Sequence, residues 1–305
     1  MAVPAIRFGV QAGLVSDAWD WLELVRKVES FGFDALYVAD HPGVTPSPFA
    51  ALTSAASVTS TLKLGTYVCN AGVRDPVMLA SDAATVDVLS NGRLVLGLGA
   101  GHTPVEWTMH GRDYPSPVAR VGRLAEMVEI VTRLLAGEVV TYDGQYVRTD
   151  SAYLLAPRPV QPKIPVLVGG NGKQLLRLTA SCADVISLTG LGRTLEDGHR
   201  HTAVWSPQSI DERVALLHEV VGVRDVVFDA LVQHVEVTDD RVAAAERVAR
   251  AVPGLTPAHV LAAPYALIGT VEQLVEELAR HRERWGFASY VVRADVIDAI
   301  APLLD

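Results

Sequence analysis

Short apolar runs alternate with amphipathic stretches along almost the whole chain, and this alternation limits the fold more than any other feature. A buried run followed by apolar residues at helical spacing is the pattern of a βα unit, and repeated units form a parallel sheet. The strands predicted from these runs are residues 6–10, 34–38, 62–69, 93–98, 164–168, 184–188, 226–237 and 289–292. The predicted helices are residues 18–31, 48–59, 76–89, 120–135, 172–182, 207–221, 239–251, 256–262 and 270–284.

Two α/β architectures are built from such units, the (β/α)8 TIM barrel and the doubly wound open sheet. The open sheet usually carries a glycine-rich turn directly after its first strand. Here Val10-Gln-Ala-Gly13 does not fit that turn, and the glycine cluster comes at residues 97–101, after the fourth strand. We therefore predict a (β/α)8 TIM barrel. Because barrels of this length are routinely one domain, we expect residues 1–305 to form a single domain.

The segment at residues 138–163 interrupts the alternation. Residues 139–142 and 145–147 are β-prone and flank Asp143-Gly144, a pair that favours a tight hairpin. We therefore predict a hairpin-containing insertion here, between the fourth and fifth strand units.

Composition excludes several classes of partner. The chain has 35 acidic and 26 basic residues, a formal net charge of −9, and no run of Lys or Arg, so a nucleic-acid partner is not expected. No apolar stretch reaches membrane-spanning length, and the N-terminus lacks a charged leader with an apolar segment behind it. Cys69 and Cys182 lack metal-ligand spacing and fit two reduced thiols better than a disulfide. We expect a cytoplasmic protein that acts on a small molecule.

The barrel prediction itself selects candidate site residues, because barrel enzymes build their sites from loops at the carboxyl ends of the strands. The candidates after strands two to five are Asp40, His41, Cys69, Asn70, Gly99, Gly101, His102, Glu106, Gly169, Gly170 and Asn171.

Asp40-His41 is the sharpest pair among these candidates. Histidine titrates near neutrality and can move a proton, while a carboxylate nearby can set its tautomer or position a ligand. The alternative is that Asp40 only satisfies the backbone of the turn. The position of Asp40 along the chain favours neither of these two interpretations.

The glycine clusters at 97–101 and 169–172 also allow two interpretations. Such loops can let a flat ring approach the backbone or offer N–H groups to a phosphate. Taken alone, the clusters fit better as tight turns that need positive φ. No Walker loop, Gly-x-Ser-x-Gly elbow or metal-ligand spacing occurs, and His199 and His201 lie in residues 190–206, predicted to form a loop.

Taken in order, several motifs resemble the luciferase-like monooxygenase superfamily, in particular its bacterial branch that uses the deazaflavin coenzyme F420. They are Phe31-Gly-Phe-Asp-Ala-Leu-Tyr-Val-Ala-Asp-His41, Leu64-Gly-Thr-Tyr-Val-Cys-Asn70, Ala83-Ala-Thr-Val-Asp-Val-Leu-Ser-Asn-Gly-Arg93, Leu96-Gly-Leu-Gly-Ala-Gly101, Pro159-Val-Gln-Pro162 with Val166-Leu-Val-Gly-Gly170, and Ile268-Gly-Thr-Val-Glu-Gln-Leu274. The resemblance covers nearly the whole chain.

The resemblance implies a bulge after the third strand with a non-proline cis peptide at Tyr67-Val68, packed against one face of the cofactor ring. It implies cofactor contacts from Asp40, His41, Thr66, Tyr67, Val68, Asn70, Gly99, Gly101, Gly169, Gly170 and Asn171. Gly169 and Gly170 would lie near the phosphate-bearing tail. Family members are commonly homodimers, so a homodimer is expected.

The function that the resemblance implies is hydride transfer between F420 and a small organic substrate, with His41 as the proton-carrying group. His102 and Glu106 are the candidate groups on the substrate side. The sugar-phosphate dehydrogenases of this group have a carboxylate where this chain has His102. They also have a tryptophan that is absent from residues 42–48 here, which disfavours a sugar phosphate.

Three alternatives remain open at this stage. The first is a flavin mononucleotide (FMN) monooxygenase on the same fold, which would consume oxygen. The second is a non-catalytic protein that binds deazaflavin or another ligand. The third is an unrelated barrel enzyme such as a lyase, which would bind neither cofactor.

Overall fold

Eight parallel strands close into a barrel in the computed structural model, which describes residues 6–13, 17–179, 181–195 and 201–304. The strands are β1 (Arg7–Ala12), β2 (Ala35–Val38), β3 (Lys63–Thr66) continued by β4 (Cys69–Asn70), β5 (Leu94–Gly99), β8 (Val166–Gly169), β9 (Val185–Leu188), β12 (Val227–Leu231) and β15 (Phe287–Arg293). They pair in the order β3-β2-β1-β15-β12-β9-β8-β5-β4, and a further β3–β5 pairing closes the ring. The predicted (β/α)8 barrel is confirmed.

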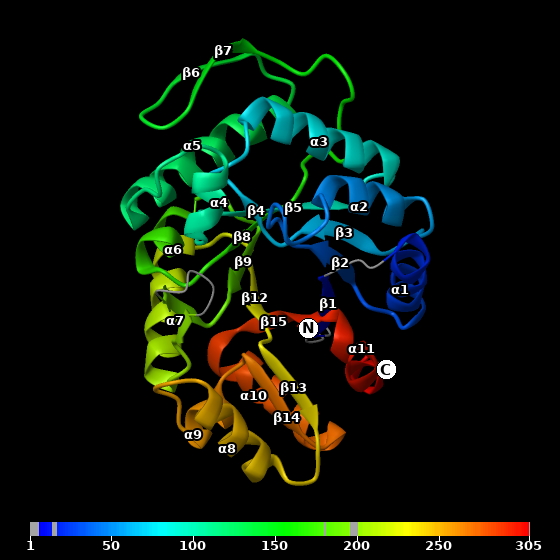
Figure 1. The fold of residues 1–305 in the computed structure, drawn as a ribbon, viewed down its shortest axis with the longest axis vertical. Helices are drawn as coiled ribbons and strands as arrows, with labels where there is room; N and C mark the ends of the chain where they lie inside the picture. Colours follow the sequence, from blue (N-terminus) through cyan, green and yellow to red (C-terminus); the bar gives the residue numbers. More distant parts are fainter. Residues whose placement is uncertain (1–5, 14–16, 180, 196–200, 305) are drawn as a thin grey trace.

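The helices surround the strands (Figure 1). They are α1 (Ala18–Ser30), α2 (Pro48–Ala56), α3 (Pro76–Leu89), α4 (Pro104–Met109), α5 (Pro117–Leu135), α6 (Lys173–Thr179), α7 (Pro207–Val221), α8 (Arg241–Ala251), α9 (Pro257–Ala262), α10 (Val271–Trp285) and α11 (Ile297–Ile300). Many begin at a proline, whose missing N–H is not needed in the first turn. The predicted helices 76–89 and 207–221 have these same bounds in the structure.

The interior of the barrel holds its own small cluster of side chains, separate from the large core between strands and helices. Tyr37 and Tyr67 fill its centre with ring centroids 5.2 Å apart. Gly9 and Gly65 leave the room for the Tyr37 ring, because a Cβ at either position would lie 2.7 Å from that ring. The alternation of side chains along each strand therefore decides what reaches the barrel axis.

Residues 62–69 were predicted to form one continuous third strand, but the structure divides this strand in two. It stops at Thr66 and resumes at Cys69, and the peptide bond between Tyr67 and Val68 is cis. The bulge implied by the family resemblance is thus confirmed at its expected position.

The predicted seventh strand, residues 226–237, is wrong beyond Leu231. The N–H of Gln233 donates to the carbonyl of Tyr265, which draws the chain out of the barrel. Strand β13 (His234–Val237) then pairs with β14 (Ala266–Gly269), a strand that the sequence pattern missed. Figure 1 shows this pair beside α8 and α10, away from the barrel strands.

The hairpin of the insertion is confirmed, but its second strand begins later than predicted. It consists of β6 (Val140–Asp143) and β7 (Arg148–Ala152) and lies beyond α3 and α5 in Figure 1. The Glu126 carboxylate of α5 accepts hydrogen bonds from the N–H groups of residues 145, 146 and 147. These groups are therefore occupied and cannot join the strand pairing.

Two further predictions need correction. The loop predicted at 190–206 contains a short antiparallel hairpin, β10 (Leu191–Thr194) with β11 (His201–Ala203). Helix α4 was not predicted, because six residues are too few to show helical periodicity.

Residue 199, which belongs to the loop predicted at 190–206, lies outside the described residues. Cys69 and Cys182 are not joined by a disulfide. No helix in the described ranges is long and apolar enough to cross a membrane.

Candidate active site

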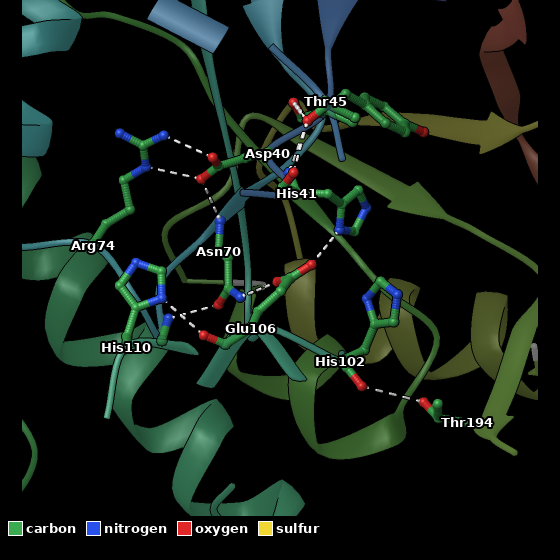
Figure 2. A network of polar contacts seen from close by, with 12 residues as sticks. Asp40, His41, Thr45, Asn70, Arg74, His102, Glu106, His110 and Thr194 are labelled. Atoms are coloured by element: carbon green, nitrogen blue, oxygen red, sulfur yellow. Dashed lines mark hydrogen bonds and ion pairs between the residues drawn. The ribbon is translucent and has the colours of Figure 1, made fainter. Parts of the chain in front are cut away.

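His41, Asn70 and Glu106 meet at the carboxyl ends of the second, third and fourth barrel strands (Figure 2). The Glu106 carboxylate lies 2.5 Å from Nδ1 of His41 and accepts a hydrogen bond from Nδ2 of Asn70 at 2.6 Å. Only 5% of the Glu106 side chain is exposed, against 36% for His41. The carboxylate therefore lies behind the imidazole, and the other edge of the His41 ring faces the mouth of the barrel.

Asn70 is held in one orientation by the loop that follows it. Its Oδ1 accepts the N–H of Gly72 at 2.8 Å, so its Nδ2 is the atom that faces Glu106. The absent side chain of Gly101 also matters here. A Cβ at that position would collide with the Asn70 amide, and the backbone there has φ +75°. The two glycine-containing loops thus fix the hydrogen-bond direction around Glu106.

Asp40 does not face the mouth. Arg74 donates to both its carboxylate oxygens, at 2.8 and 2.7 Å, and the N–H of Asn70 donates to one of them at 3.2 Å. Asp40 is 3% exposed, and the Arg74 guanidinium also lies over the ring of Phe49. This bidentate pair ties the end of the second strand to the third, which positions the adjacent His41. Sequence reasoning missed Arg74, since no local pattern indicates a partner 34 residues away.

His102 lies at the rim of the mouth beside His41. The two ring centroids are 5.6 Å apart (Figure 2). The ring of His201 on β11 lies 4.8 Å from that of His102. His102 is exposed as a whole residue, although the surrounding protein displaces part of the water around its ring. This desolvation, together with the imidazoles of His201 and His41, lowers the pKa of His102 to about 4. His102 is therefore neutral at physiological pH.

Val68 forms the floor of the mouth, in the space left by three glycines of β5 and β8. A Cβ added at Gly99 would lie 2.5 Å from the Val68 side chain, and one at Gly97 or Gly169 would lie 3.3 or 3.1 Å from it. Thr66 does not reach the mouth, because its hydroxyl is bonded to the backbone of Gly97. The result is an apolar floor made of one valine and three glycines, which suits one face of a planar ring. We call Val68 together with Gly97, Gly99 and Gly169 the Val68 floor.

Asn171, two residues after Gly169, is buried without its polar atoms being satisfied. It is 6% exposed, and neither its Oδ1 nor its Nδ2 has a hydrogen-bond partner among the described residues. Its carbonyl oxygen accepts from Nε of Arg213 on α7 at 2.9 Å. Buried amides are normally paired, so this one is available to a polar group of a ligand. Gly170 precedes it with φ +155°, and a Cβ at Gly170 would lie 3.1 Å from the Leu175 side chain.

The residues predicted after strands two to five therefore gather at one end of the barrel, although Asp40, Thr66 and Glu106 are turned away from the opening. The structure adds Gln11, which lies 6% exposed on β1 and donates to the Tyr67 carbonyl at 2.6 Å. A cavity of about 340 Å³ opens at the opposite end, near Arg7, Lys63 and Asp184, far from these groups. Within the described ranges, no three His, Cys, Asp or Glu side chains are arranged to hold a metal.

Comparison with known proteins shows the family. The sequence pattern described as luciferase-like monooxygenase matches residues 6–289. The chain belongs to this family. Among curated relatives, the F420-dependent glucose-6-phosphate dehydrogenase of Nakamurella multipartita is 33% identical over 193 residues, which is 60% of this chain and 56% of the relative. The match thus spans little more than half the length of that family member.

Solved structures confirm the fold of this luciferase-like chain. The F420-dependent tetrahydromethanopterin reductase of Methanopyrus kandleri superposes with a TM-score of 0.74 at 21% identity, covering 99% of this chain and all of that one. A type II Baeyer-Villiger monooxygenase of Pseudomonas putida, solved with FMN, gives 0.72 at 17% identity, covering 99% of this chain and 95% of the other. At these identities the likeness shows the fold alone.

Proposed function

We propose that the chain is an F420-dependent oxidoreductase that transfers a hydride between the deazaflavin and a small organic substrate. The observation that carries the proposal is the His41–Glu106–Asn70 network beside the Val68 floor, a proton-handling group next to a surface shaped for a planar ring. The F420-dependent relatives support the choice of cofactor.

The residues at the mouth fit such a cofactor. Val68 would contact one face of the ring, and the backbone at Gly169 and Gly170 would approach its tail. The unpaired Asn171 amide would donate to and accept from polar atoms of that tail. When bound, the deazaflavin supplies the carbon that accepts or gives up the hydride, so the protein has to orient, exclude water and handle the proton.

His41 would handle that proton at Nε2. An ionised Glu106 accepts the Nδ1 proton, which leaves Nε2 of neutral His41 as an acceptor facing the mouth. An alcohol substrate would give its hydroxyl proton to Nε2 as its hydride leaves, and a carbonyl substrate would take a proton from Nε2 in the reverse direction. Because Glu106 is buried and both its oxygens are engaged, we assign it to positioning His41 and not to substrate contact.

His102 would contact the substrate as a neutral group. With its pKa lowered to about 4, it can donate or accept a hydrogen bond without adding a charge near the reacting atoms. This suits a neutral alcohol or carbonyl compound.

The test begins with equilibrium binding of F420 and of FMN, followed by fluorescence. Selective F420 binding, then turnover on a panel of alcohols, aldehydes and ketones, is the expected result. Preference for FMN with oxygen consumption would instead support a monooxygenase, the alternative that the FMN-bound neighbour favours. Tight F420 binding without turnover would support a binding protein, and binding of neither cofactor would refute the proposal.

The role of His41 is tested by His41→Ala. We expect turnover to fall by about 10²–10⁴-fold, the usual contribution of a positioned acid or base, with F420 affinity retained. His110→Ala is the matched control, because within the described part of the chain the His110 ring hydrogen-bonds to the backbone oxygen of Glu106, at 2.8 Å, and not to its carboxylate. A His41→Ala protein as active as the control would remove His41 from the mechanism.

A homodimer in the cytoplasm completes the proposal. Apolar side chains on the outer side of α3 support a partner surface, since Met78 and Leu89 are 62% and 56% exposed. Sedimentation equilibrium of the purified protein distinguishes a dimer from a monomer.

A further inference from the structure

Residue 67 is held by four different barrel strands. Its N–H donates to the carbonyl of Val38 on β2 at 2.9 Å, and its carbonyl accepts from Nε2 of Gln11 on β1. Its hydroxyl donates to Oδ1 of Asp229 on β12 at 2.7 Å and contacts the hydroxyl of Ser187 on β9. Tyr67 therefore spans the inside of the barrel, from the mouth to the polar groups beneath it.

Those polar groups form one layer across three adjacent strands. Asp229 is in register with Ser187 on one side and with Ser289 on the other. Asp229 is 1% exposed, and burial raises the pKa of its carboxyl group, while hydrogen bonds from the hydroxyls of Ser187, Tyr67 and Ser289 oppose that rise. Burying a carboxyl group in a barrel interior is costly unless its oxygens are satisfied. The layer thus has a purpose other than filling space.

The position of this layer indicates that purpose. Tyr67 immediately precedes Val68, whose side chain forms the floor of the mouth among Gly97, Gly99 and Gly169. Gly169 is itself in register with Ser187. Glycines offer no side chain that could hold Val68 in place, so its position depends on the anchoring of residue 67.

We propose that the Tyr67 hydroxyl, held by Asp229 and Ser187, is a positioning group that fixes the Val68 floor against which the cofactor ring lies. This inference rests on the proposed function. Removing the hydroxyl would leave the backbone bonds of residue 67 but free its side chain to shift, and Val68 would move with it.

The neighbouring Tyr37 provides a matched control. Its ring lies 5.2 Å from that of Tyr67 inside the same barrel. Its hydroxyl, however, forms no hydrogen bond with any residue in the described part of the chain. We call the contacts of the Tyr67 hydroxyl with Asp229 and Ser187 the anchor. Tyr37→Phe removes a hydroxyl group from the same barrel interior without changing the anchor.

The experiment measures Kd for F420 by fluorescence titration and the circular dichroism induced in bound F420, which reports the geometry of the ring. For Tyr67→Phe we expect about tenfold weaker binding, which corresponds to the free energy of one buried hydrogen bond. We also expect a changed induced signal. Ser187→Ala should weaken binding by about threefold, because Asp229 keeps its bond from Tyr67. Tyr37→Phe should match the wild type in both measurements.

The outcomes distinguish failure of the anchor from failure of the proposed function. Tyr67→Phe with wild-type affinity and induced signal overturns the anchor, as does Tyr37→Phe with an equal loss. Should Tyr67→Phe fail to fold, Ser187→Ala decides in the same way. A wild-type protein that binds neither F420 nor FMN overturns the proposed function and the anchor with it, whereas wild-type binding with unchanged variants overturns the anchor alone.

Discussion

Replacing Glu106 by glutamine isolates what the carboxylate contributes to His41, because the substitution keeps the size of the side chain and changes only its hydrogen bonds. In the native chain both carboxylate oxygens accept, one from His41 Nδ1 and one from Asn70 Nδ2. A glutamine has one oxygen and one NH₂ group for these two donors. One of the two partners must therefore change from donor to acceptor.

The surrounding loops decide which contact changes. Asn70 cannot turn its amide, because its Oδ1 accepts the Gly72 N–H. The oxygen of a glutamine at position 106 would face Asn70, and its NH₂ group would face Nδ1 of His41. His41 would then adopt the tautomer with Nδ1 as acceptor and the proton on Nε2, the atom that we assign to accepting the substrate proton.

The expected effect follows from this tautomer. Turnover of an alcohol should fall by about 10²–10⁴-fold, as for loss of a general base, while F420 affinity stays within about twofold. A lost charge-assisted bond in a buried network costs about 1.5–3 kcal/mol, so the melting temperature should also fall by a few degrees. The tautomer itself is read from the ¹⁵N chemical shifts of the His41 ring, which do not depend on a substrate.

Glu126→Gln is the matched control for Glu106→Gln. Glu126 accepts three backbone N–H groups of the insertion hairpin, so its replacement should destabilise the protein without changing turnover. Glu106→Gln with turnover within threefold of this control, or with an unchanged His41 tautomer, would refute the reasoning.

Two further predictions concern the floor and the acid limit of stability. Gly99→Ala places a Cβ 2.5 Å from Val68, so overpacking of about 1–3 kcal/mol should lower the melting temperature and weaken F420 binding by about tenfold. Gly172→Ala, with open space around it, should leave the melting temperature unchanged. His281 is 3% exposed, and burial lowers its pKa to about 4, although the charge of Glu277 opposes this. Because the unfolded chain then binds the proton more tightly, stability should fall from about pH 6.5 toward pH 4, by at most about 3 kcal/mol. Thermal unfolding of His281→Leu across that range should show a smaller loss, and an equal loss would contradict the assignment.

Local sequence was enough to place most elements of the barrel. Periodicity and end signals depend on residues within one element, which is why helices 76–89 and 207–221 were predicted with their observed bounds. The errors occur where distant groups compete for the backbone. Glu126 draws residues 145–147 out of the hairpin, and Tyr265 ends the seventh strand early.

The candidate site divides in the same way. The barrel rule places His41, Asn70 and Gly169 at one end, because parallel strands carry their loops to the same edge. Which side chains face the opening could not be predicted. Glu106 turns toward His41, 65 residues away in the sequence, and Arg74 hydrogen-bonds to Asp40, 34 residues away.

The sequence by itself determined the number of βα units, the barrel class and the residue types that follow each strand, because these depend on periodicity and composition. Only the tertiary structure decided that Glu106 lies behind His41, and that Asp229 reaches Tyr67 across 162 residues. Such contacts form when the ring of strands closes. A buried carboxylate then takes whichever donors the register brings within hydrogen-bond distance, and no local pattern contains that register.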